Sequence, residues 1–293
     1  MKSRQTYRIW INRICSGLVC LFCLLALVPF FAVVWSLLSH GLELFHTNLF
    51  DQLFLNYSDE MVRQVEETSV SANILYGMGG SLLIVIIGLI PAVPLGILFT
   101  LYVFENRFHG FASLIYYLGA SISGIPSVII GMIAYLWIVE PLNGFPALAG
   151  GLSLSIMMLP IISHYTLHVL NILPVGLKES AMALGASYTD TMLRIVLPSM
   201  KNGLFAGILM TVSRMIAQSV PLIIIVMGTS AIQGDKSLSH AALPVLIWNF
   251  FNCPDMIHRM WAASLTLFLM VLVLTVFAKC MSYPLQNKKR ISL

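Results

Sequence analysis

Six long, mainly apolar stretches run through the chain, and they constrain its fold more than any other feature. The hydrocarbon core of a bilayer is about 30 Å thick, so a crossing helix needs roughly 20 such residues. The composition agrees, because 58% of the residues are hydrophobic and 10% are charged, whereas about a quarter are charged in soluble domains. The predicted fold class is an all-α integral membrane protein. We predict six spans, at residues 14–38, 73–104, 113–139, 147–170, 204–227 and 258–278.

The distribution of charge predicts how the chain is oriented. Short cytoplasmic loops keep Lys and Arg, whereas exported loops do not. With the N-terminus inside, twelve of the sixteen Lys and Arg are cytoplasmic and nine of the twelve Asp and Glu are external. An even number of spans with both termini cytoplasmic satisfies every loop. The net charge of +4 therefore follows from topology in the lipid bilayer, and no nucleic acid is expected as a partner.

The first span is expected to be a retained anchor, because its apolar run exceeds the roughly 7 to 15 residues of a signal-peptide core. It contains Cys20 and Cys23 at a C-x-x-C spacing, but no second pair or nearby His accompanies them, so we expect packing and no metal site. A basic segment (1–13) precedes this span and an acidic external loop (39–72) follows it. A later external loop contains an apolar segment at 241–251 that is too short to cross and is expected at the membrane interface.

The predicted cytoplasmic loop 171–203 has the pattern of a helical hairpin. Helix-forming residues run from 179 to 184 and again from 188 to 196, with Gly185 permitting a sharp turn between them. Pro198 is expected to end the second helix. The hairpin carries too many apolar side chains for a solvated loop, so a partner protein is expected to cover them. These residues are Met182, Leu184, Met192, Leu193 and Ile195.

This loop resembles the EAA motif of binding-protein-dependent ABC permeases, with the pattern E-x-A, three residues, G, nine residues, I-x-L-P. The matching residues are Glu179, Ala181, Gly185, Ile195, Leu197 and Pro198. The resemblance implies six transmembrane helices in the type I ABC importer permease arrangement, with the hairpin docked on a separate ATPase subunit. ATP and Mg would be used by that subunit, because this chain has no G-x-x-x-x-G-K-[ST] loop and is expected to bind no cofactor. An ordinary helix-connecting loop is the alternative.

Three further segments narrow the resemblance to phosphate-transporter permeases of the PstA type, over about residues 73 to 227. They are Ser123-Gly-Ile-Pro-Ser-Val-Ile-Ile-Gly131, Pro94-Leu-Gly96 and Ala147-Leu-Ala-Gly-Gly-Leu152. In physical terms, Gly124 and Pro126 loosen a helix at mid-membrane, which is tolerated only beside neighbours or a water-lined cavity. A kinked helix with small residues for close packing is the other reading.

The resemblance also implies a complete assembly in a bacterial plasma (inner) membrane. The chain would form half of a phosphate pore, paired with a second, unlike permease chain and served by two ATPase subunits and an external phosphate-binding protein. The permease domain is then 73–279, with the coupling hairpin at 171–203 and a basic cytoplasmic tail at 280–293.

Arg214 is the one formally charged residue deep in a predicted span, where insertion costs at least about 2.5 to 3.5 kcal/mol. We expect it to face the pore, because a guanidinium presents a planar fork of donors that matches phosphate oxygens. Gln218 follows one turn later and is expected on the same face. A partner subunit could instead supply a carboxylate that pairs with Arg214.

His164 is expected about 15 Å into the membrane, near the depth of Arg214. Ser163, Thr166 and Ser123 are expected to add hydroxyl groups to the same path. The resemblance leads us to expect Arg at position 164 and Glu at position 218, and the chain has His and Gln there. The transported solute is therefore open between phosphate, another oxyanion such as sulfate or molybdate, and an organic solute.

An enzyme embedded in the membrane is a competing class of function. The sequence shows no Ser-His-Asp set, no H-E-x-x-H and no Asp pair within a predicted span, so no catalytic residue is assigned.

We predict that His164 contributes positive charge to the path when it is protonated, because histidine is the side chain whose charge most readily changes near cellular pH. Uptake measured against pH should then differ in profile between the wild type and His164→Gln. Identical profiles would remove this role.

Overall fold

The computed structural model describes residues 2–44, 70–106, 108–142, 146–174, 176–233 and 242–291, and within these ranges it contains helices and no strand. Five helices or joined helical segments are long and apolar enough to cross a membrane, or six if one bent pair is a single span. Most of the predicted acidic loop lies outside the described residues. The long helices are α1 (Lys2–Leu44), α3 (Val70–Glu105), α7 (Pro146–Ile172), α10 (Leu197–Ile216) and α13 (Ile257–Ile291).

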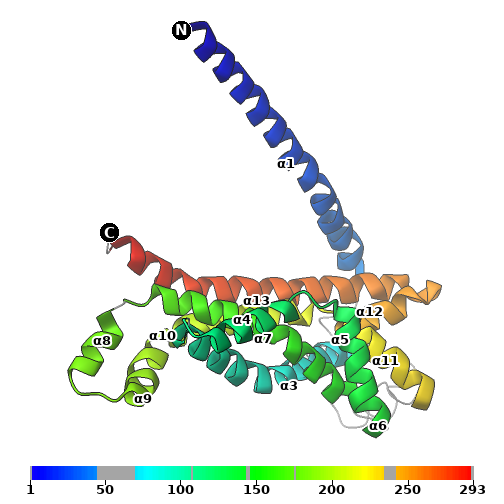
Figure 1. The fold of residues 1–293 in the computed structure, drawn as a ribbon. Helices are drawn as coiled ribbons and strands as arrows, with labels where there is room; N and C mark the ends of the chain where they lie inside the picture. Colours follow the sequence, from blue (N-terminus) through cyan, green and yellow to red (C-terminus); the bar gives the residue numbers. More distant parts are fainter. Residues whose placement is uncertain are drawn as a thin grey trace.

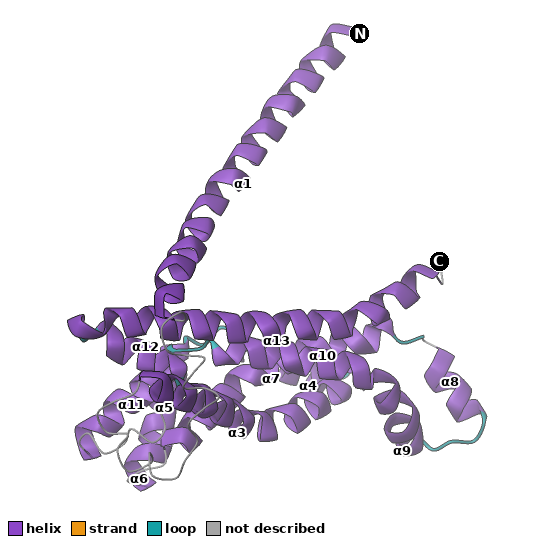
Figure 2. Ribbon diagram, turned by 180° about the vertical axis from the view of Figure 1, so that it is seen from behind, coloured by secondary structure: helices purple, strands orange, loops and turns teal. Residues whose placement is uncertain are grey.

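Helices α3, α7, α10 and α13 lie side by side and form the body of the molecule (Figures 1 and 2). Two short helices, α8 (Gly176–Ala183) and α9 (Tyr188–Asp190), project from one end, called the hairpin end below. Four others gather at the other end: α5 (Ser127–Ala134), α6 (Glu140–Leu142), α11 (Val220–Gln233) and α12 (Leu243–Phe251). Helix α1 leaves this opposite end and extends away from the bundle. It is joined to α13 where the ring of His40 stacks on Trp261, with centroids 5.1 Å apart, and where Gly41 lies against Leu265.

Helix α7 is the centre of the core, and the predicted span 147–170 matches it closely. Its side chains Leu154 and Met158 are fully buried in a cluster with Ile84 of α3 and Ile216 of α10. Near the hairpin end, Val169 and Leu170 of α7 instead pack with Met200 and Leu204. Because the early part of α7 meets the late part of α10, and the reverse at the other end, the two helices run antiparallel.

Small residues set how closely α3 and α7 approach. A Cβ on Gly88 would lie 2.7 Å from the carbonyl oxygen of Gly151, and a Cβ on Gly151 would lie 2.4 Å from the side chain of Ile87. Lipid tails are as apolar as the side chains, so close backbone contact replaces hydrophobic burial as the driving force between membrane helices.

The third predicted span, 113–139, is broken at the place where the sequence predicted a loosened helix. It is divided into α4 (Gly110–Ile122) and the segment Ser127–Leu142, which bends from α4 by 94°. That segment comprises α5 (Ser127–Ala134), the π turn η3 (Tyr135–Val139) and α6 (Glu140–Leu142). The break falls at the predicted Gly124 and Pro126, since Pro126 has no N–H to continue the helix and disfavours helical geometry in the residue before it.

The fifth predicted span, 204–227, is also not continuous. Helix α10 ends at Ile216 and a separate helix, α11 (Val220–Gln233), follows it. The continuous helical stretch extends the other way, from Tyr188 to Ile216. Helix α11 packs on α5, with Pro221 against Gly131 and the Tyr135 hydroxyl donating to the carbonyl of Gly228 at 3.2 Å.

The short apolar segment predicted at 241–251 forms α12 (Leu243–Phe251), which packs into the bundle. Leu243, Leu246 and Phe250 are buried with Ile74 of α3 and Ala263 of α13. The backbone N–H of Leu243 donates to the Ser81 hydroxyl at 2.8 Å, which satisfies a donor at the first turn of α12.

We predict that Gly88→Ala destabilises the bundle although Ala favours a helix over Gly by about 1 kcal/mol. The added methyl group meets a carbonyl oxygen that cannot move aside, and overpacking costs about 1 to 3 kcal/mol. Thermal unfolding of the detergent-solubilised chain should show a lower Tm. Gly79→Ala on the same helix is the control, because its methyl group meets nothing within 4 Å. A Tm for Gly88→Ala equal to that of Gly79→Ala would contradict the packing role.

Candidate functional site

The predicted helix-turn-helix hairpin is present, from α8 (Gly176–Ala183) to α9 (Tyr188–Asp190). Gly185 joins them with a φ of +89°, in the left-handed region that side chains disfavour. The N–H of Ala186 donates to the carbonyl of Ala181 at 3.2 Å and that of Gly185 to Met182 at 3.0 Å. This bonding closes the end of α8 as a Schellman motif, which is why a glycine is needed at the turn.

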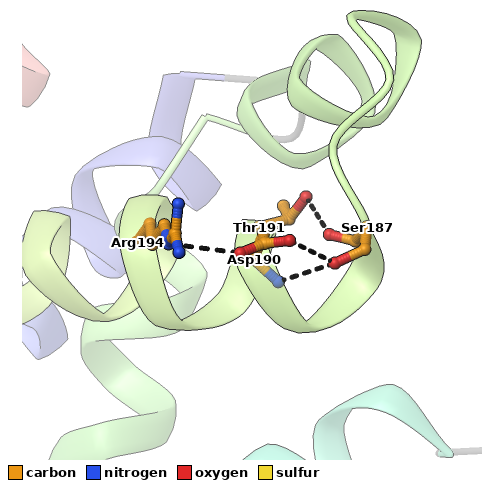
Figure 3. Close-up of polar contacts among 4 residues, drawn as sticks. All are labelled: Ser187, Asp190, Thr191 and Arg194. Atoms are coloured by element: carbon orange, nitrogen blue, oxygen red, sulfur yellow. Dashed lines mark hydrogen bonds and ion pairs between the residues drawn. The ribbon is translucent and has the colours of Figure 1, made fainter.

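Ser187 fixes the start of the second helix (Figure 3). Its hydroxyl oxygen accepts from the backbone N–H of Asp190 at 3.1 Å and donates to the Asp190 carboxylate at 2.6 Å. Its carbonyl accepts from the Thr191 hydroxyl at 2.9 Å. Asp190 also pairs with Arg194, at 3.1 Å between Oδ1 and Nε. A serine cap of this kind satisfies donors that the first turn would leave free.

Pro198 does not end the second helix, contrary to the sequence-based prediction. Helix α9 continues through the π turn η4 (Thr191–Val196) directly into α10. At the end of the π turn, the N–H of Leu197 donates to the carbonyl of Met192, five residues earlier. Proline lacks an N–H and clashes with the carbonyl four residues before it. Both the missing N–H and the clash concern Arg194, which lies in the π turn and is already outside α-helical bonding. The helix therefore continues past Pro198.

The six motif residues divide between anchoring and exposed positions. Ala181 is buried, and Ile195 and Leu197 are half-buried. Glu179, Gly185 and Pro198 are exposed.

The apolar surface of the hairpin is smaller than predicted. Met192 is buried against the bundle, and Ile195 is half-buried. Met182, Leu184 and Leu193 remain exposed, with exposed fractions of 46%, 90% and 59%. We call these three residues the docking surface, because within the described chain nothing covers them.

Arg214 lies on the exposed side of α10. No carboxylate of the described residues lies within ion-pair distance of its guanidinium. Gln218 is half-buried in the break between α10 and α11, so it does not continue the face of Arg214 along one helix as predicted. The helix ends two residues before Gln218, and the one-turn spacing no longer applies.

His164 is exposed on α7, but its predicted hydroxyl neighbours turn inward. Thr166 is fully buried and donates to the carbonyl of Ile162 at 2.8 Å. Ser163 is 9% exposed and donates to the carbonyl of Leu159 at 2.8 Å. Both hydroxyl groups are therefore used within the bundle. Ser123 is exposed, in the break between α4 and α5.

His164 and Arg214 do not lie at the same depth. Tyr165 meets Gly207 where antiparallel α7 and α10 contact each other. Arg214 is seven residues further along α10, which is about 10 Å at 1.5 Å per residue. The depth estimate from sequence failed because it counted from the ends of each span, while α10 is part of a longer helix.

Sequence reasoning missed an ion pair at the hairpin end and a second exposed histidine on α7. Lys178 Nζ lies 2.5 Å from Glu105 Oε2, and also 5.1 Å from the ring centroid of Tyr188. Lys178 and Glu105 were each visible as a charge beside an apolar run, but their contact joins residues 73 positions apart. His168 is exposed one turn after His164, and the spacing of four residues was the available signal.

Comparison with known protein families gives a match over most of the chain. The model of the family described as "Binding-protein-dependent transport system inner membrane component" matches residues 92–290. PstA, a phosphate transport system permease protein of Haemophilus influenzae, is 26% identical over 95% of this chain and 98% of its own length. PstA of Mycobacterium leprae is 29% identical over 74% of this chain and 72% of its own. A probable PstA of Methanocaldococcus jannaschii is 23% identical, with 93% of each chain covered.

Two solved structures share the fold. A chain of the inward-facing MetNI methionine ABC transporter has a TM-score of 0.53 at 15% identity, covering 78% of this chain and 99% of its own. A chain of a bacterial alginate ABC transporter, solved with an alginate-bound periplasmic protein, has a TM-score of 0.54 at 16% identity, covering 88% and 93%. The predicted fold class, an all-α membrane protein in the type I importer permease arrangement, is confirmed.

Proposed function

Because this chain belongs to the family of binding-protein-dependent transport system inner membrane components, we propose that it forms half of the translocation pore of an ATP-driven phosphate importer. The phosphate assignment is supported by likeness to PstA proteins from three organisms along most of the chain. The second half of the pore is a homologous but unlike permease chain. An external phosphate-binding protein delivers the anion.

The hairpin is the single observation that carries this proposal. It combines the six motif residues, a glycine-dependent turn at Gly185 and an exposed docking surface. Exposed apolar side chains at a helix turn are suited to insertion into a groove of another protein. We assign that groove to an ATPase subunit, two of which use ATP and Mg, so the chain itself is a permease and not an enzyme.

The hairpin end faces the cytoplasm in this proposal, and the membrane is the bacterial plasma (inner) membrane. The positive charges predicted to be inside include Lys178, Arg194 and Lys201, all at the hairpin end. Helix α13 runs toward that end, and α1 enters the bundle from the opposite one (Figure 1). Both termini are then cytoplasmic, in keeping with retention of positive charge on that side.

The transport path runs past Arg214, between the two broken segments. Arg214 on the exposed side of α10 cannot face lipid without the insertion cost of a charge, so it faces the pore or the partner chain. Helix α11 starts six residues after Arg214. Its second residue, Pro221, packs against Gly131, which lies one turn after the start of α5. Two helix starts therefore lie near one another, and the positive ends of half-helix dipoles suit an anion in transit.

The proposed mechanism is alternating access. ATP closes the two ATPase subunits, which move the hairpins they hold, and the bundle rocks so that the region of Arg214 changes its exposure from one side of the membrane to the other. Gln218 and Ser123, in the two helix breaks, and exposed His164 contribute polar groups along this path. Ser163 and Thr166 support α7 from within the bundle.

We predict that Gly185→Val and Glu179→Ala each reduce phosphate uptake by at least about tenfold while the chain still inserts. A β-branched residue at positive φ is strained by about 1 to 2 kcal/mol, and the turn that presents the docking surface would change. Uptake of radiolabelled phosphate and the amount of membrane-inserted chain are the measurements. Gly176→Ala is the matched control, since its methyl group meets nothing within 4 Å. Unchanged uptake in both variants would contradict the coupling role.

We also predict that Arg214→Gln loses phosphate uptake, and that Arg214→Lys keeps part of it. Lysine retains the charge but not the planar fork of donors. Lys201→Gln, an exposed charge near the hairpin end of the same helix, should leave uptake unchanged. Competition by excess sulfate or molybdate tests the alternative solute. Wild-type uptake by Arg214→Gln would exclude Arg214 from the path.

A further inference from the structure

A recess separates the hairpin from the body of the molecule. Its volume is about 660 Å³, and it is lined by Phe104 and Glu105 of α3, Leu170 of α7, and Leu177, Lys178 and Met182 of the hairpin. Helix α8 therefore does not rest on α3 through a continuous apolar contact. Helix α8 is held by its chain connections, by packing against η4 and by side-chain contacts that cross the recess.

One ion pair crosses this recess. Lys178 on α8 lies 2.5 Å from the carboxylate of Glu105, the last residue of α3. Their side chains are 33% and 19% exposed, so the pair is partly withdrawn from water. The other ion pair in the described part of the chain, Asp190–Arg194, lies within one helix and is more exposed, at 48% and 81%.

The ion pair also offsets the repulsion between the Glu105 carboxylate and the end of its own helix. The C-terminal end of a helix carries partial negative charge, so a carboxylate there is repelled unless a cation accompanies it. Glu105 occupies that position on α3, and Lys178 is the cation beside it. The same ammonium lies over the ring of Tyr188, at 5.1 Å from its centroid. One side chain thus joins the end of α3, helix α8 and the start of α9.

Helix α3 leads from this pair to the proposed path. Five residues before Glu105, the Thr100 hydroxyl donates to the carbonyl of Gly96 at 2.7 Å and shares this hydrogen with the carbonyl of Ser163 at 3.3 Å. Ser163 precedes exposed His164 on α7. Since α3 also packs closely along α7 at Gly88 and Gly151, we expect a displacement at the end of α3 to move both helices together.

We infer that Glu105 and Lys178 form a strut that holds the hairpin at a set position against α3 and transmits its movement to the bundle. They are positioning residues for coupling and do not touch the anion or ATP. This inference rests on the proposed function, because it requires that an ATPase subunit move the hairpin.

The test uses the complete transporter in proteoliposomes, with both permease chains, both ATPase subunits and the external binding protein. Radiolabelled inorganic phosphate uptake and ATP hydrolysis are measured on the same preparation. Glu105→Gln and Lys178→Met should still assemble and hydrolyse ATP, while phosphate moved per ATP falls at least about fivefold, the low end of coupling between sites. A loss of hydrolysis and uptake in equal proportion would overturn the strut, because it would reflect assembly alone.

Charge exchange gives the sharper result. The double variant Glu105→Lys with Lys178→Glu restores an opposite-charge pair, and its phosphate moved per ATP should return to within about threefold of the wild type, since the coupling between two partners is what such cycles isolate. If the single variants fail to assemble, this double variant decides: a ratio near the wild type supports the strut, and a low ratio overturns it.

Two controls lie in the same hairpin. Asp190→Asn with Arg194→Gln removes the exposed pair of α9 and should leave phosphate moved per ATP unchanged. Tyr188→Phe keeps the ring under Lys178 and should behave as the wild type. A loss in the Asp190 and Arg194 variant as large as that of Glu105→Gln would assign the effect to hairpin charge in general and overturn the strut.

Failure of this inference is distinguishable from failure of the proposed function. If Gly185→Val and Glu179→Ala abolish uptake while Glu105→Gln keeps the wild-type ratio, the hairpin couples transport without the strut. If none of these variants affects uptake, the coupling role of the hairpin is itself wrong.

Discussion

The need to satisfy every backbone N–H and C=O inside a bilayer governs this structure. Water is absent from the hydrocarbon core, so a chain can cross it only as helices, unless broken segments are covered by protein or line a polar cavity. Helices α3, α7, α10 and α13 meet the first condition as long, nearly continuous elements. The short helices α5 and α11 that follow the two breaks meet the second, because they pack on one another where Pro221 lies against Gly131 and on α7 through Ala134 and Ile225 beside Ala149.

Close backbone approach and local helix breaks have different effects on the bundle. Glycines at 88 and 151 bring α3 and α7 together as one rigid pair, and the hydroxyl of Thr100 joins them again nearer the hairpin. The breaks instead produce short helices, α5 and α11, that pack on α7 as separate segments. In the proposed rocking movement, a change of angle would be taken up at these few breaks, as in other hinged transitions.

The hairpin illustrates how a local motif depends on distant residues. Gly185 and Ser187 determine its turn through bonds within about six residues, and these follow from residue type alone. Its attachment to α3 depends on Lys178 and Glu105, which are far apart in the chain. The family motif begins at Glu179, so the residue that anchors the hairpin lies just outside it. Motif matching could identify the hairpin, but not how it is connected to the helices beside it.

Sequence alone determined the membrane class, the approximate spans, the hairpin and its glycine turn, because each depends on local composition or on backbone geometry set by residue type. Three features appear only in the tertiary structure. The helix continues past Pro198 by way of a π turn just before it, and Ser163 and Thr166 turn inward. Gln218 lies beyond the end of the helix that carries Arg214. An apolar helix is hydrophobic on every side, so its sequence does not indicate which side meets a neighbour, a pore or lipid. Only the packing of one helix against another resolves that choice.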